Sequence, residues 1–366
     1  MLPHLFSLTP DQLAELLRGA DVPCSDAEAR RVVSRLVADG RPDLTGPHPV
    51  AKVLRAAVDA HTRRDLPRVL ERVPDPDDGS VRYLFEAEDG VVFEAVRIPL
   101  HKAGRFSVCL SSQAGCAMGC DFCATGRLGL KRNLKSWEMV AQWRIVQDEA
   151  PGRVSGAVFM GQGEPLHNYD EVIQAAKMLS HPNGGRISAD NITISTVGLV
   201  PQLRRYTREG HPYRLIVSLT SAIPERRAQL LPVAGRFPLP ELMDALKEHA
   251  EAHGDRQTVA WVLMAGVNTG PDEVEALKGL LEGMPLRFNL IDVNDSRPDG
   301  YARAEDAERK RFIDALQALK APVVRRYSVG RGRHSACGML AGKRLAELAA
   351  EDAAAAAISA PPPSSA

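Results

Sequence analysis

The sequence predicts an α/β fold: an open, partial (β/α)6 barrel preceded by an α-helical accessory module and a β-hairpin. Two observations carry this prediction. From about residue 105 onwards, apolar strand-like runs alternate with helical patterns, which is typical of parallel strands joined by right-handed crossovers. The residues before this region carry helical patterns and then two alternating runs. Roughly six units over about 220 residues fit an open barrel better than a closed eightfold barrel.

The first module, residues 1–75, is expected to be helical. Helical patterns cover most of residues 8–72. Thr9 and Pro10 form a helix start with proline in the first turn. Two further helices are predicted after it, the second of them at about residues 50–60, because apolar residues recur there on one helical face.

A β-hairpin linker and the barrel follow this module. The runs 81–87 and 91–98 alternate apolar and polar residues around Glu-Asp-Gly, which predicts a hairpin within residues 76–100. The barrel core is placed at residues 101–332. Its predicted strands are 105–110, 156–160, 191–195, 214–219, 258–264, 286–291 and 322–327, and its predicted helices are 136–149, 170–180, 238–253, 272–282 and 305–320. The remaining modules are a cysteine-bearing loop with a C-terminal helix at 333–348 and a disordered tail at 349–366.

The composition is that of an ordinary globular protein. The 366 residues carry 46 basic and 46 acidic side chains, so a formal net charge of zero gives no general support for nucleic-acid binding. No apolar run approaches the roughly 20 residues that span a bilayer, and the N-terminus lacks the pattern of a secretory signal. Three of the six cysteines lie close together, which is not a secreted disulfide framework. We expect a cytoplasmic monomer that does not bind membranes.

The strongest chemical signal is a Cys-x₃-Cys-x₂-Cys spacing. The thiolates of Cys116, Cys120 and Cys123 can hold a [4Fe–4S] cluster by three of its irons, which leaves the fourth iron open to a small molecule. S-adenosylmethionine (SAM) is the expected occupant, because its amino and carboxylate groups can chelate that iron. Zinc takes four ligands and no second cysteine knuckle is present, while thiols this close make a poor disulfide set. We therefore expect one [4Fe–4S] cluster and SAM, with zinc as the alternative.

Other candidate cofactor contacts follow the ends of predicted strands, where sites in parallel sheets form. The turn at residues 161–165, Gly-Gln-Gly-Glu-Pro, permits close backbone approach, so Gly163 and Glu164 are candidates for binding the amino group of SAM. Residues that end the later strands can hold a carboxylate or a ribose. These candidates are Ser195, Ser218, Leu219, Thr220 and Asn294. A local turn cap is the alternative role for each of them.

Two further cysteines are expected at the same mouth. Cys109 ends the first barrel strand, and Cys337 lies in a glycine-flanked stretch after the last strand. Exposed thiols near a cation become nucleophilic, so we interpret the two as a catalytic pair, with Arg333 and His334 supplying the charge. Cys24 is interpreted as a small buried hydrophobe.

Taken together, these motifs resemble those of the RlmN/Cfr family of radical-SAM adenosine methyltransferases, and the resemblance covers most of the chain. The matching stretches are Cys-Leu-Ser-Ser-Gln-Ala-Gly-Cys at 109–116 with the cysteine run that follows, Gly-Leu-Lys-Arg-Asn-Leu at 129–134, Gly-Gln-Gly-Glu-Pro-Leu-His-Asn at 161–168, Ile-Ser-Thr-Val-Gly-Leu-Val-Pro at 194–201 and Ala-Cys-Gly-Met-Leu-Ala-Gly at 336–342. The paired cysteines at 109 and 337 separate this family from radical-SAM enzymes in general. The chain departs from the family at 218–220, where Ser-Leu-Thr replaces Ser-Leu-His, and in the loop after Asn294.

The resemblance implies a radical-SAM barrel and a reaction that uses SAM twice. One SAM methylates Cys337, and a second, on the cluster, yields a deoxyadenosyl radical that abstracts hydrogen from the S-methyl group. The methylene radical adds to an amidine carbon of adenine, with C2 favoured over C8, in rRNA and in tRNA as a further candidate substrate. Glu94 is implied as the proton acceptor, and Cys109 as the thiol that frees the base through a transient disulfide with Cys337. An external electron donor such as flavodoxin or ferredoxin is implied as well.

Two other functions stay open at the level of the sequence. Zero net charge favours a radical-SAM enzyme that modifies a peptide or a small metabolite. A non-catalytic, metal-stabilised binding protein would need only the cysteine run. For RNA, the helical module would contact shape and backbone, and the candidate basic clusters lie at 131–135, 204–208 and 325–333. Each cluster is equally consistent with a solvated protein surface.

Overall fold

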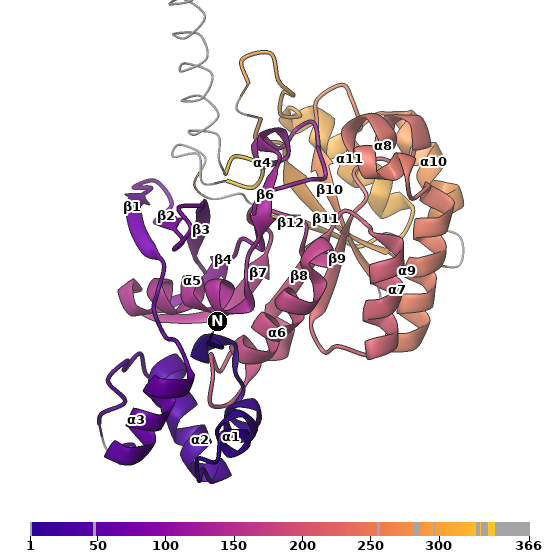
Figure 1. The fold of residues 1–366 in the computed structure, drawn as a ribbon. Helices are drawn as coiled ribbons and strands as arrows, with labels where there is room; N and C mark the ends of the chain where they lie inside the picture. The colour runs from indigo at the N-terminus through magenta and orange to yellow at the C-terminus, as the bar shows by residue number, and fades with distance from the viewer. Residues whose placement is uncertain are drawn as a thin grey trace, which may run out of the picture.

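The computed structural model describes residues 2–46, 49–254, 257–281, 284, 286–295, 297–326, 330 and 336–340. Within these residues the main sheet has ten strands in the order β1-β2-β3-β4-β7-β8-β9-β10-β11-β12 (Figure 1). The strands are β1 (Arg68–Pro74), β2 (Val81–Glu86), β3 (Val92–Pro99), β4 (Arg105–Cys109), β7 (Arg153–Phe159), β8 (Ile192–Thr196), β9 (Arg214–Ser218), β10 (Gln257–Leu263), β11 (Leu286–Asp292) and β12 (Val323–Arg326). The helices are α1 (Pro10–Gly19), α2 (Asp26–Val33), α3 (Lys52–His61), α4 (Ala124–Leu128), α5 (Ser136–Glu149), α6 (Tyr169–Ser180), α7 (Val200–Glu209), α8 (Pro224–Leu230), α9 (Leu239–His253), α10 (Pro271–Leu281) and α11 (Asp306–Ala318). A separate antiparallel pair is formed by β5 (Gln113–Gly115) and β6 (Leu130–Asn133).

The strands from β4 to β12 in the main sheet all run parallel to their neighbours. Every crossover between them carries a helix, and strands that follow one another along the chain lie side by side in the sheet. All carboxyl ends therefore point to the same edge. No pairing in the described part of the chain joins β1 to β12, so the sheet is open. The predicted partial barrel, preceded by helices and a hairpin, is confirmed.

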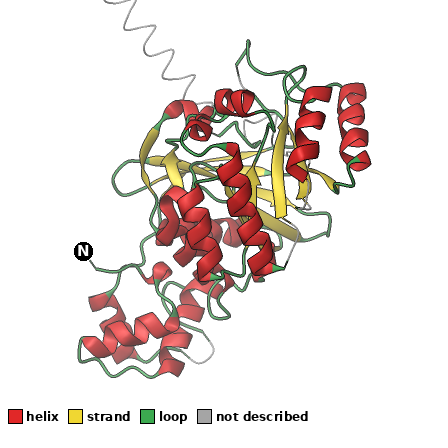
Figure 2. Cartoon of the chain, turned by 90° about the vertical axis from the view of Figure 1, so that its right-hand side faces the viewer, coloured by secondary structure: helices red, strands yellow, loops and turns green. Residues whose placement is uncertain are grey.

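The main helices of the core lie against the sheet, as Figures 1 and 2 show. Strands covered in this way bury large apolar side chains. Trp261 of β10 packs against Phe288 of β11 and Phe312 of α11, with ring centroids 6.0 and 5.5 Å apart. Loops occupy the edge that the carboxyl ends of the parallel strands form, and the site described below lies there. None of the helices in the described ranges is both long and apolar enough to cross a bilayer.

Residues 68–74 form strand β1, where the sequence pattern predicted helix. Leu, Glu and Arg favour helix locally, but β1 pairs antiparallel with β2, and every second residue of β1 is exposed. Cross-strand pairing therefore overrides local propensity. β2 and β3 form the predicted hairpin, which is part of a larger sheet. β1, β2 and β3 continue into β4 by antiparallel pairing and belong to the main sheet.

Two helices between β8 and β10 were not predicted. α7 buries only Val200, Leu203 and Tyr206, which lie on one helical face. Its periodicity is helical, but these apolar residues are few and lie among several arginines. α8 is seven residues long, too short for the period to show. The β5–β6 pair is shorter still, and its pairing depends on residues far apart in sequence.

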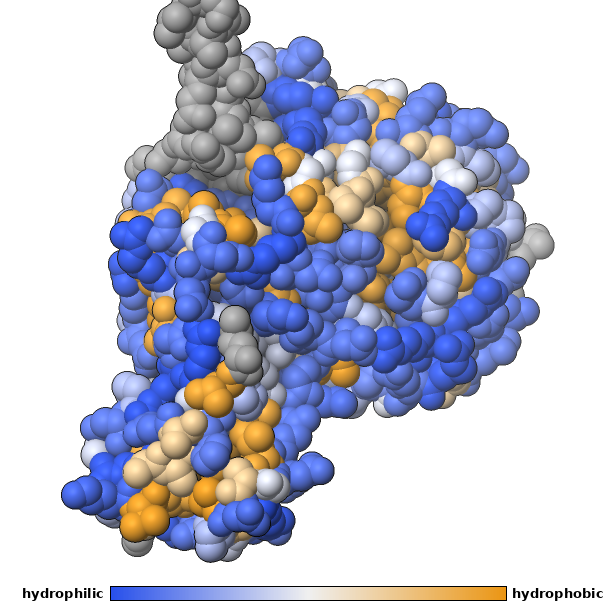
Figure 3. Space-filling view, viewed as in Figure 1, coloured by the Kyte–Doolittle hydropathy of each residue, from blue (hydrophilic) through white to orange (hydrophobic). Residues whose placement is uncertain are grey.

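The helical module formed by α1, α2 and α3 docks onto the core through buried polar contacts. The ring of His4 stacks on Trp137 of α5, with ring centroids 4.1 Å apart. Arg144, also on α5, donates to the carbonyl oxygens of Val37 and Ala38 at 3.0 and 3.1 Å. These carbonyls end a helical stretch, so the arginine satisfies groups that have no partner within the helix. Figure 3 shows that the module, at the lower left, also exposes apolar residues on the face in view.

We predict that mild acid weakens this docking through His4. Its Nε2 donates to Asp65 O at 2.8 Å and its Nδ1 accepts from Phe6 N at 3.3 Å, which requires the neutral ring. Burial lowers the pKa of His4 from 6.5 to about 4, so between these values the unfolded chain binds the proton and the folded chain does not. Stability is therefore lost as pH falls below 6.5, by roughly 2 kcal/mol at about pH 5.

Between neutral pH and about pH 5, the melting temperature of His4→Gln should fall by less than that of the wild type. His249 leaves a residual dependence in both proteins, because burial also lowers its pKa to about 4. His101→Gln, at an exposed histidine, is the matched control and should behave as the wild type does. An equal loss of Tm in His4→Gln and the wild type would show that His4 does not carry the effect.

Candidate active site

The clustered cysteines lie on a loop that leaves the carboxyl end of β4. β5 and β6 pair across the two ends of this loop, and Cys116 N donates to Gly129 O at 3.1 Å. Gly115 has a φ of +74°, and a Cβ there would lie 1.8 Å from that same oxygen, so only glycine fits. The loop is thus tied at both ends. It brings Cys116, Cys120 and Cys123 to the wall of one cavity.

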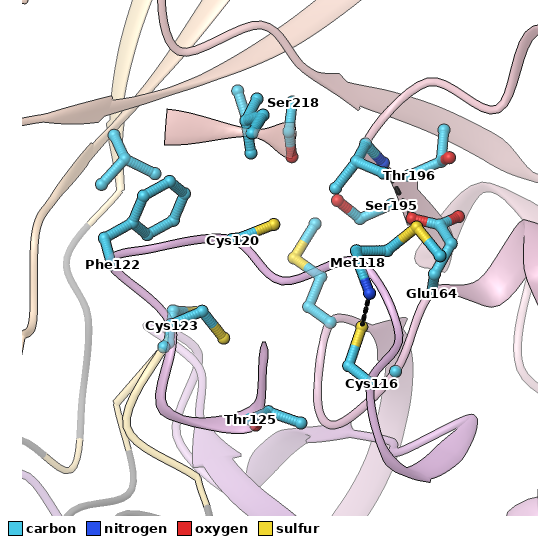
Figure 4. A pocket seen from close by; sticks show the side chains of 18 of the residues that line it. Cys116, Met118, Cys120, Phe122, Cys123, Thr125, Glu164, Ser195, Thr196 and Ser218 are labelled. Carbon is cyan, nitrogen blue, oxygen red and sulfur yellow. Dashed lines mark hydrogen bonds between the residues drawn. The ribbon is translucent and has the colours of Figure 1, made fainter. Parts of the chain in front are cut away.

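The thiols fit an iron–sulfur cluster better than a zinc ion. Figure 4 shows Cys116, Cys120 and Cys123 around the same space. A [4Fe–4S] cluster takes one thiolate on each of three irons, so its ligands stand apart, whereas zinc needs four ligands at about 2.0–2.3 Å from one point. The residues present therefore suit the predicted cluster.

The turn at residues 161–165 packs directly on the cysteine loop. Gly163 has a φ of +102°, and a Cβ there would lie 2.6 Å from the Cβ of Gln113 and 2.8 Å from its backbone nitrogen. The Gln113 side chain accepts from Glu164 N at 2.8 Å and donates to Asn133 Oδ1 at 2.7 Å. Glycine is needed here for close contact between two backbone segments. Through this contact, the turn after β7 forms part of the cavity wall.

Glu164 is buried, and the protein itself binds its carboxylate. Oε1 accepts from Leu166 N at 2.9 Å, and Oε2 accepts from Val197 N at 2.8 Å. Burial outweighs these bonds and raises the pKa of the carboxyl group to about 7. The residue lines the cavity and joins the turn after β7 to the end of β8. Its contact with SAM, like that of Gly163, stays a prediction.

The predicted contacts on β8 and β9 divide into two groups. Ser195 and Ser218, at the carboxyl ends of these strands, line the cavity near the cysteine loop (Figure 4). Leu219 and Thr220 are fully buried and are not part of the cavity wall in the described residues. Thr220 has a φ of +61°, and its buried hydroxyl group has no hydrogen-bond partner. The chain therefore turns away from the cavity directly after Ser218.

The segment that carries Cys337 reaches the same cavity and packs against Cys109. Cys337 lines the cavity, and Asn294 donates its amide to Cys337 O at 3.3 Å. Cys109 is buried at the end of β4, in one apolar cluster with Leu340 of the segment that carries Cys337. Burial, and then the charge of Cys337, raise the pKa of Cys109 to about 12, while Arg326 of β12 opposes the shift. All six cysteines lie in the described residues and are free, so no disulfide joins the pair in this structure.

Glu94 lies on β3, on the same face of the sheet as Cys109. Val96 pairs with Cys109 in the antiparallel ladder, and Glu94 is two residues away on the same side. Its buried carboxylate forms an ion pair with Arg82 and accepts from Gln162 Nε2 at 3.0 Å. The carboxylate is therefore held in one place near the cysteine pair. Its role as a proton acceptor stays a prediction.

Two cations of this site were missed from the sequence. Arg82 is not part of a recognisable motif. Only the alternation of apolar and polar residues in the run 81–87 indicates that its side chain lies on the same face as Glu94. Arg326 ends β12, and its guanidinium donates to the sulfur of Met160 at 2.6 Å. The cations expected beside the cysteine pair, Arg333 and His334, lie outside the described residues. In the described part of the chain, Arg326 supplies the positive charge near Cys109.

Among the residues that the structure describes, most side chains of the suggested basic clusters form ion pairs within the protein. Arg132 forms ion pairs with acidic residues before β3 and on α5. Arg204 and Arg205 pair with acidic residues of the neighbouring helices α9 and α6. Arg325 pairs with the last residue of β11. Because these charges already have partners, each cluster is weakened as a surface for RNA phosphates.

Comparison with known proteins extends these observations. The family model described as Radical SAM superfamily matches residues 110–281. A probable RNA methyltransferase of Anaeromyxobacter sp. (strain Fw109-5) is 48% identical over 90% of this chain and 96% of its own length. A dual-specificity RNA methyltransferase RlmN of Syntrophobacter fumaroxidans is 39% identical over 80% of this chain and 84% of its own. The crystal structure of a radical SAM methyltransferase from Sphaerobacter thermophilus has a TM-score of 0.84 at 34% identity, over 92% of this chain and 99% of that one.

These similarities reach well beyond the radical-SAM core. They include the helical module and the first strands of the sheet, since the Anaeromyxobacter relative covers 90% of the chain. The open parallel sheet, the three thiols at one cavity and the second cysteine pair agree with the resemblance seen in the sequence. The chain belongs to the RlmN/Cfr family of radical-SAM RNA methyltransferases.

Proposed function

We propose that this protein methylates an amidine carbon of adenine in RNA, C2 in preference to C8, with a methyl group carried on Cys337. rRNA is the first candidate substrate and tRNA the second. The observation that carries the proposal is that Cys337 lines the cavity of the three clustered thiols, while Cys109 packs in one buried cluster with Leu340 of the same segment. The names of the relatives, which include a dual-specificity RNA methyltransferase, support RNA as the substrate.

Different parts of the cavity wall would bind the cluster and SAM. Cys116, Cys120 and Cys123 would hold the [4Fe–4S] cluster, and the ends of β7, β8 and β9 would hold SAM. When bound, the cluster and SAM supply a sulfonium methyl group and one-electron chemistry, with electrons from an external donor such as flavodoxin or ferredoxin. Apolar side chains such as Phe122 and Val197 line the same cavity, and they would keep water from the reacting groups.

The cysteine pair and Glu94 would carry the transfer. Cys337 is partly exposed and Cys109 is buried, so Cys337 takes the methyl group on Sγ and presents it to the base. Glu94 accepts the proton that the adenine carbon loses once it is bonded to the methylene carbon, and the one unpaired electron of the adduct would return to the bound cluster. The thiolate of Cys109 then attacks Cys337 Sγ. A disulfide bond forms, the sulfur–methylene bond breaks, and the electron pair left on carbon takes up a proton to give the methyl product.

Two charged neighbours suit these roles. Arg326 favours the thiolate of Cys109, which burial alone would disfavour. Arg82 and Gln162 fix the carboxylate of Glu94, so that it need not reorganise when a proton is transferred. A dithiol reductant would return the pair to the free thiols after each turnover.

Mass spectrometry of rRNA and tRNA tests the substrate. RNA from a deletion strain should lack one methyladenosine, and the position of its methyl group separates C2 from C8. Complementation with the wild type or Cys24→Ala should restore the modification, because Cys24 lies in the core of the helical module. Complementation with Cys337→Ala should not restore it. If deleted and complemented strains show the same methyladenosines, RNA is not the substrate, and a peptide or metabolite becomes the better candidate.

We predict that Cys109→Ala traps a covalent adduct between Cys337 and RNA. Without the resolving thiol, the bond between sulfur and the methylene carbon stays intact, and multiple turnover should fall by about 100-fold or more. A denaturing gel should show a protein band shifted by RNA and restored by ribonuclease. Cys24→Ala is the control and should turn over at the wild-type rate. Normal turnover of Cys109→Ala without an adduct would remove Cys109 from the mechanism.

A further inference from the structure

Arg227 is a buried cation beside the cavity. It lies on α8, and 1% of the residue is exposed. Its Nη2 donates to Val197 O at 3.0 Å and to Ser218 O at 3.3 Å, which are carbonyls at the ends of β8 and β9. Its buried Nε has no hydrogen-bond partner. In the described part of the chain no carboxylate pairs with it. The helix that carries it packs on the cysteine loop: Asp121 N donates to Leu230 O at 3.2 Å, and Leu230 shares an apolar cluster with Cys120.

The neighbouring arginine of α8, Arg226, has acidic partners. Arg226 is partly exposed and pairs with Asp272 and Glu273 of α10. Arg227 has no such partner, although an uncompensated charge in the interior is costly. Burial lowers its pKa to about 10, which still leaves it cationic at neutral pH. An anion bound on the side of the cysteine loop would supply the missing counter-charge.

The position of Arg227 is fixed by the cavity wall. The peptide groups flanking Val197 accept from Arg227 through Val197 O and donate to the buried carboxylate of Glu164 through Val197 N. A second bond to Ser218 O ties the guanidinium to the next strand. The cation thus lies at a set place relative to the cysteine loop and has little freedom to follow another partner.

We propose that Arg227 is the counter-charge of the iron–sulfur cluster and raises its reduction potential. The inference rests on the cluster proposed above. A [4Fe–4S] core held by three thiolates is a net anion, and reduction by one electron from an external donor adds one negative charge. A fixed cation beside Cys120 stabilises the more negative form to a greater extent. Arg227 acts through the cluster, so it is a positioning residue and not a catalytic one.

Redox titration of the reconstituted protein, followed by electron paramagnetic resonance of the reduced cluster, tests the proposal. Arg227→Gln removes the charge and keeps a hydrogen-bond donor, and its potential should be more negative than that of the wild type. Arg227→Lys keeps the charge and should stay close to the wild type. Arg226→Gln is the matched control, because its charge is already paired with acidic residues away from the cavity, and it should leave the potential unchanged.

The outcomes separate charge from structure. A wild-type potential in Arg227→Gln would overturn the proposal, as would equal shifts in Arg227→Gln and Arg227→Lys, which would indicate the bonds to Val197 and Ser218 instead. If Arg227→Gln does not fold, Arg227→Met provides a second neutral variant, and a chelator should strip its iron faster than that of Arg227→Lys. Equal rates would contradict the counter-charge. A wild type that takes up no iron would instead overturn the cluster itself, and this inference with it.

Discussion

The close packing of Gly163 on Gln113 is the contact on which the geometry of the site depends. It presses the turn after β7 against the loop after β4, with no room for a Cβ at Gly163. Hydrogen bonds extend the contact from Gln113 to Glu164, from Glu164 to Val197, and from Val197 to Arg227. The cysteine loop and the ends of three parallel strands are therefore held as one wall. A loop that carries three thiols needs such a support, because ligand positions must be set before a cluster binds.

Four buried charged side chains lie along this wall and at the strands beside it. Glu164 and Arg227 lie on the cavity side, and the ion pair of Glu94 with Arg82 lies next to the cysteine pair. Buried charges contribute little to folding stability by themselves, so their presence here is better explained by groups that bind or react. The surface differs, because four of the six arginines that the structure describes in the suggested basic clusters are paired with acids. Recognition of RNA by this neutral chain would then depend on shape and on local contacts.

Much of the site could be predicted because parallel strands bring their carboxyl ends to one edge. The cysteine spacing, the glycine turn, Ser195 and Ser218 are local signals, and the strand order that joins them follows from the alternation of strands and helices. The pattern could not separate Ser218 from Leu219 and Thr220, since a change of direction over one residue decides which side chain reaches the cavity. It also could not assign residues 68–74 to β1, because that strand is stabilised by its partner and not by its own composition.

Other features could not be predicted because their partners are distant in sequence. Arg227 is held by backbone carbonyls of two strands. Every residue has such a carbonyl, so the residue types do not indicate which of them bind the arginine. Arg82 meets Glu94 across a strand pair, so its role depends on register. Arg326 acts on Cys109 because β12 and β4 belong to one sheet, whose carboxyl ends surround the same site.

The central claim is that Cys116, Cys120 and Cys123 hold a cluster with one iron open to SAM. The most direct measurement is metal content after anaerobic reconstitution, together with SAM cleavage on reduction. The account predicts about four iron atoms per chain and release of 5′-deoxyadenosine, both lost in Cys120→Ala and kept in Cys24→Ala. A protein that binds zinc instead, takes up no iron and leaves SAM intact would contradict it.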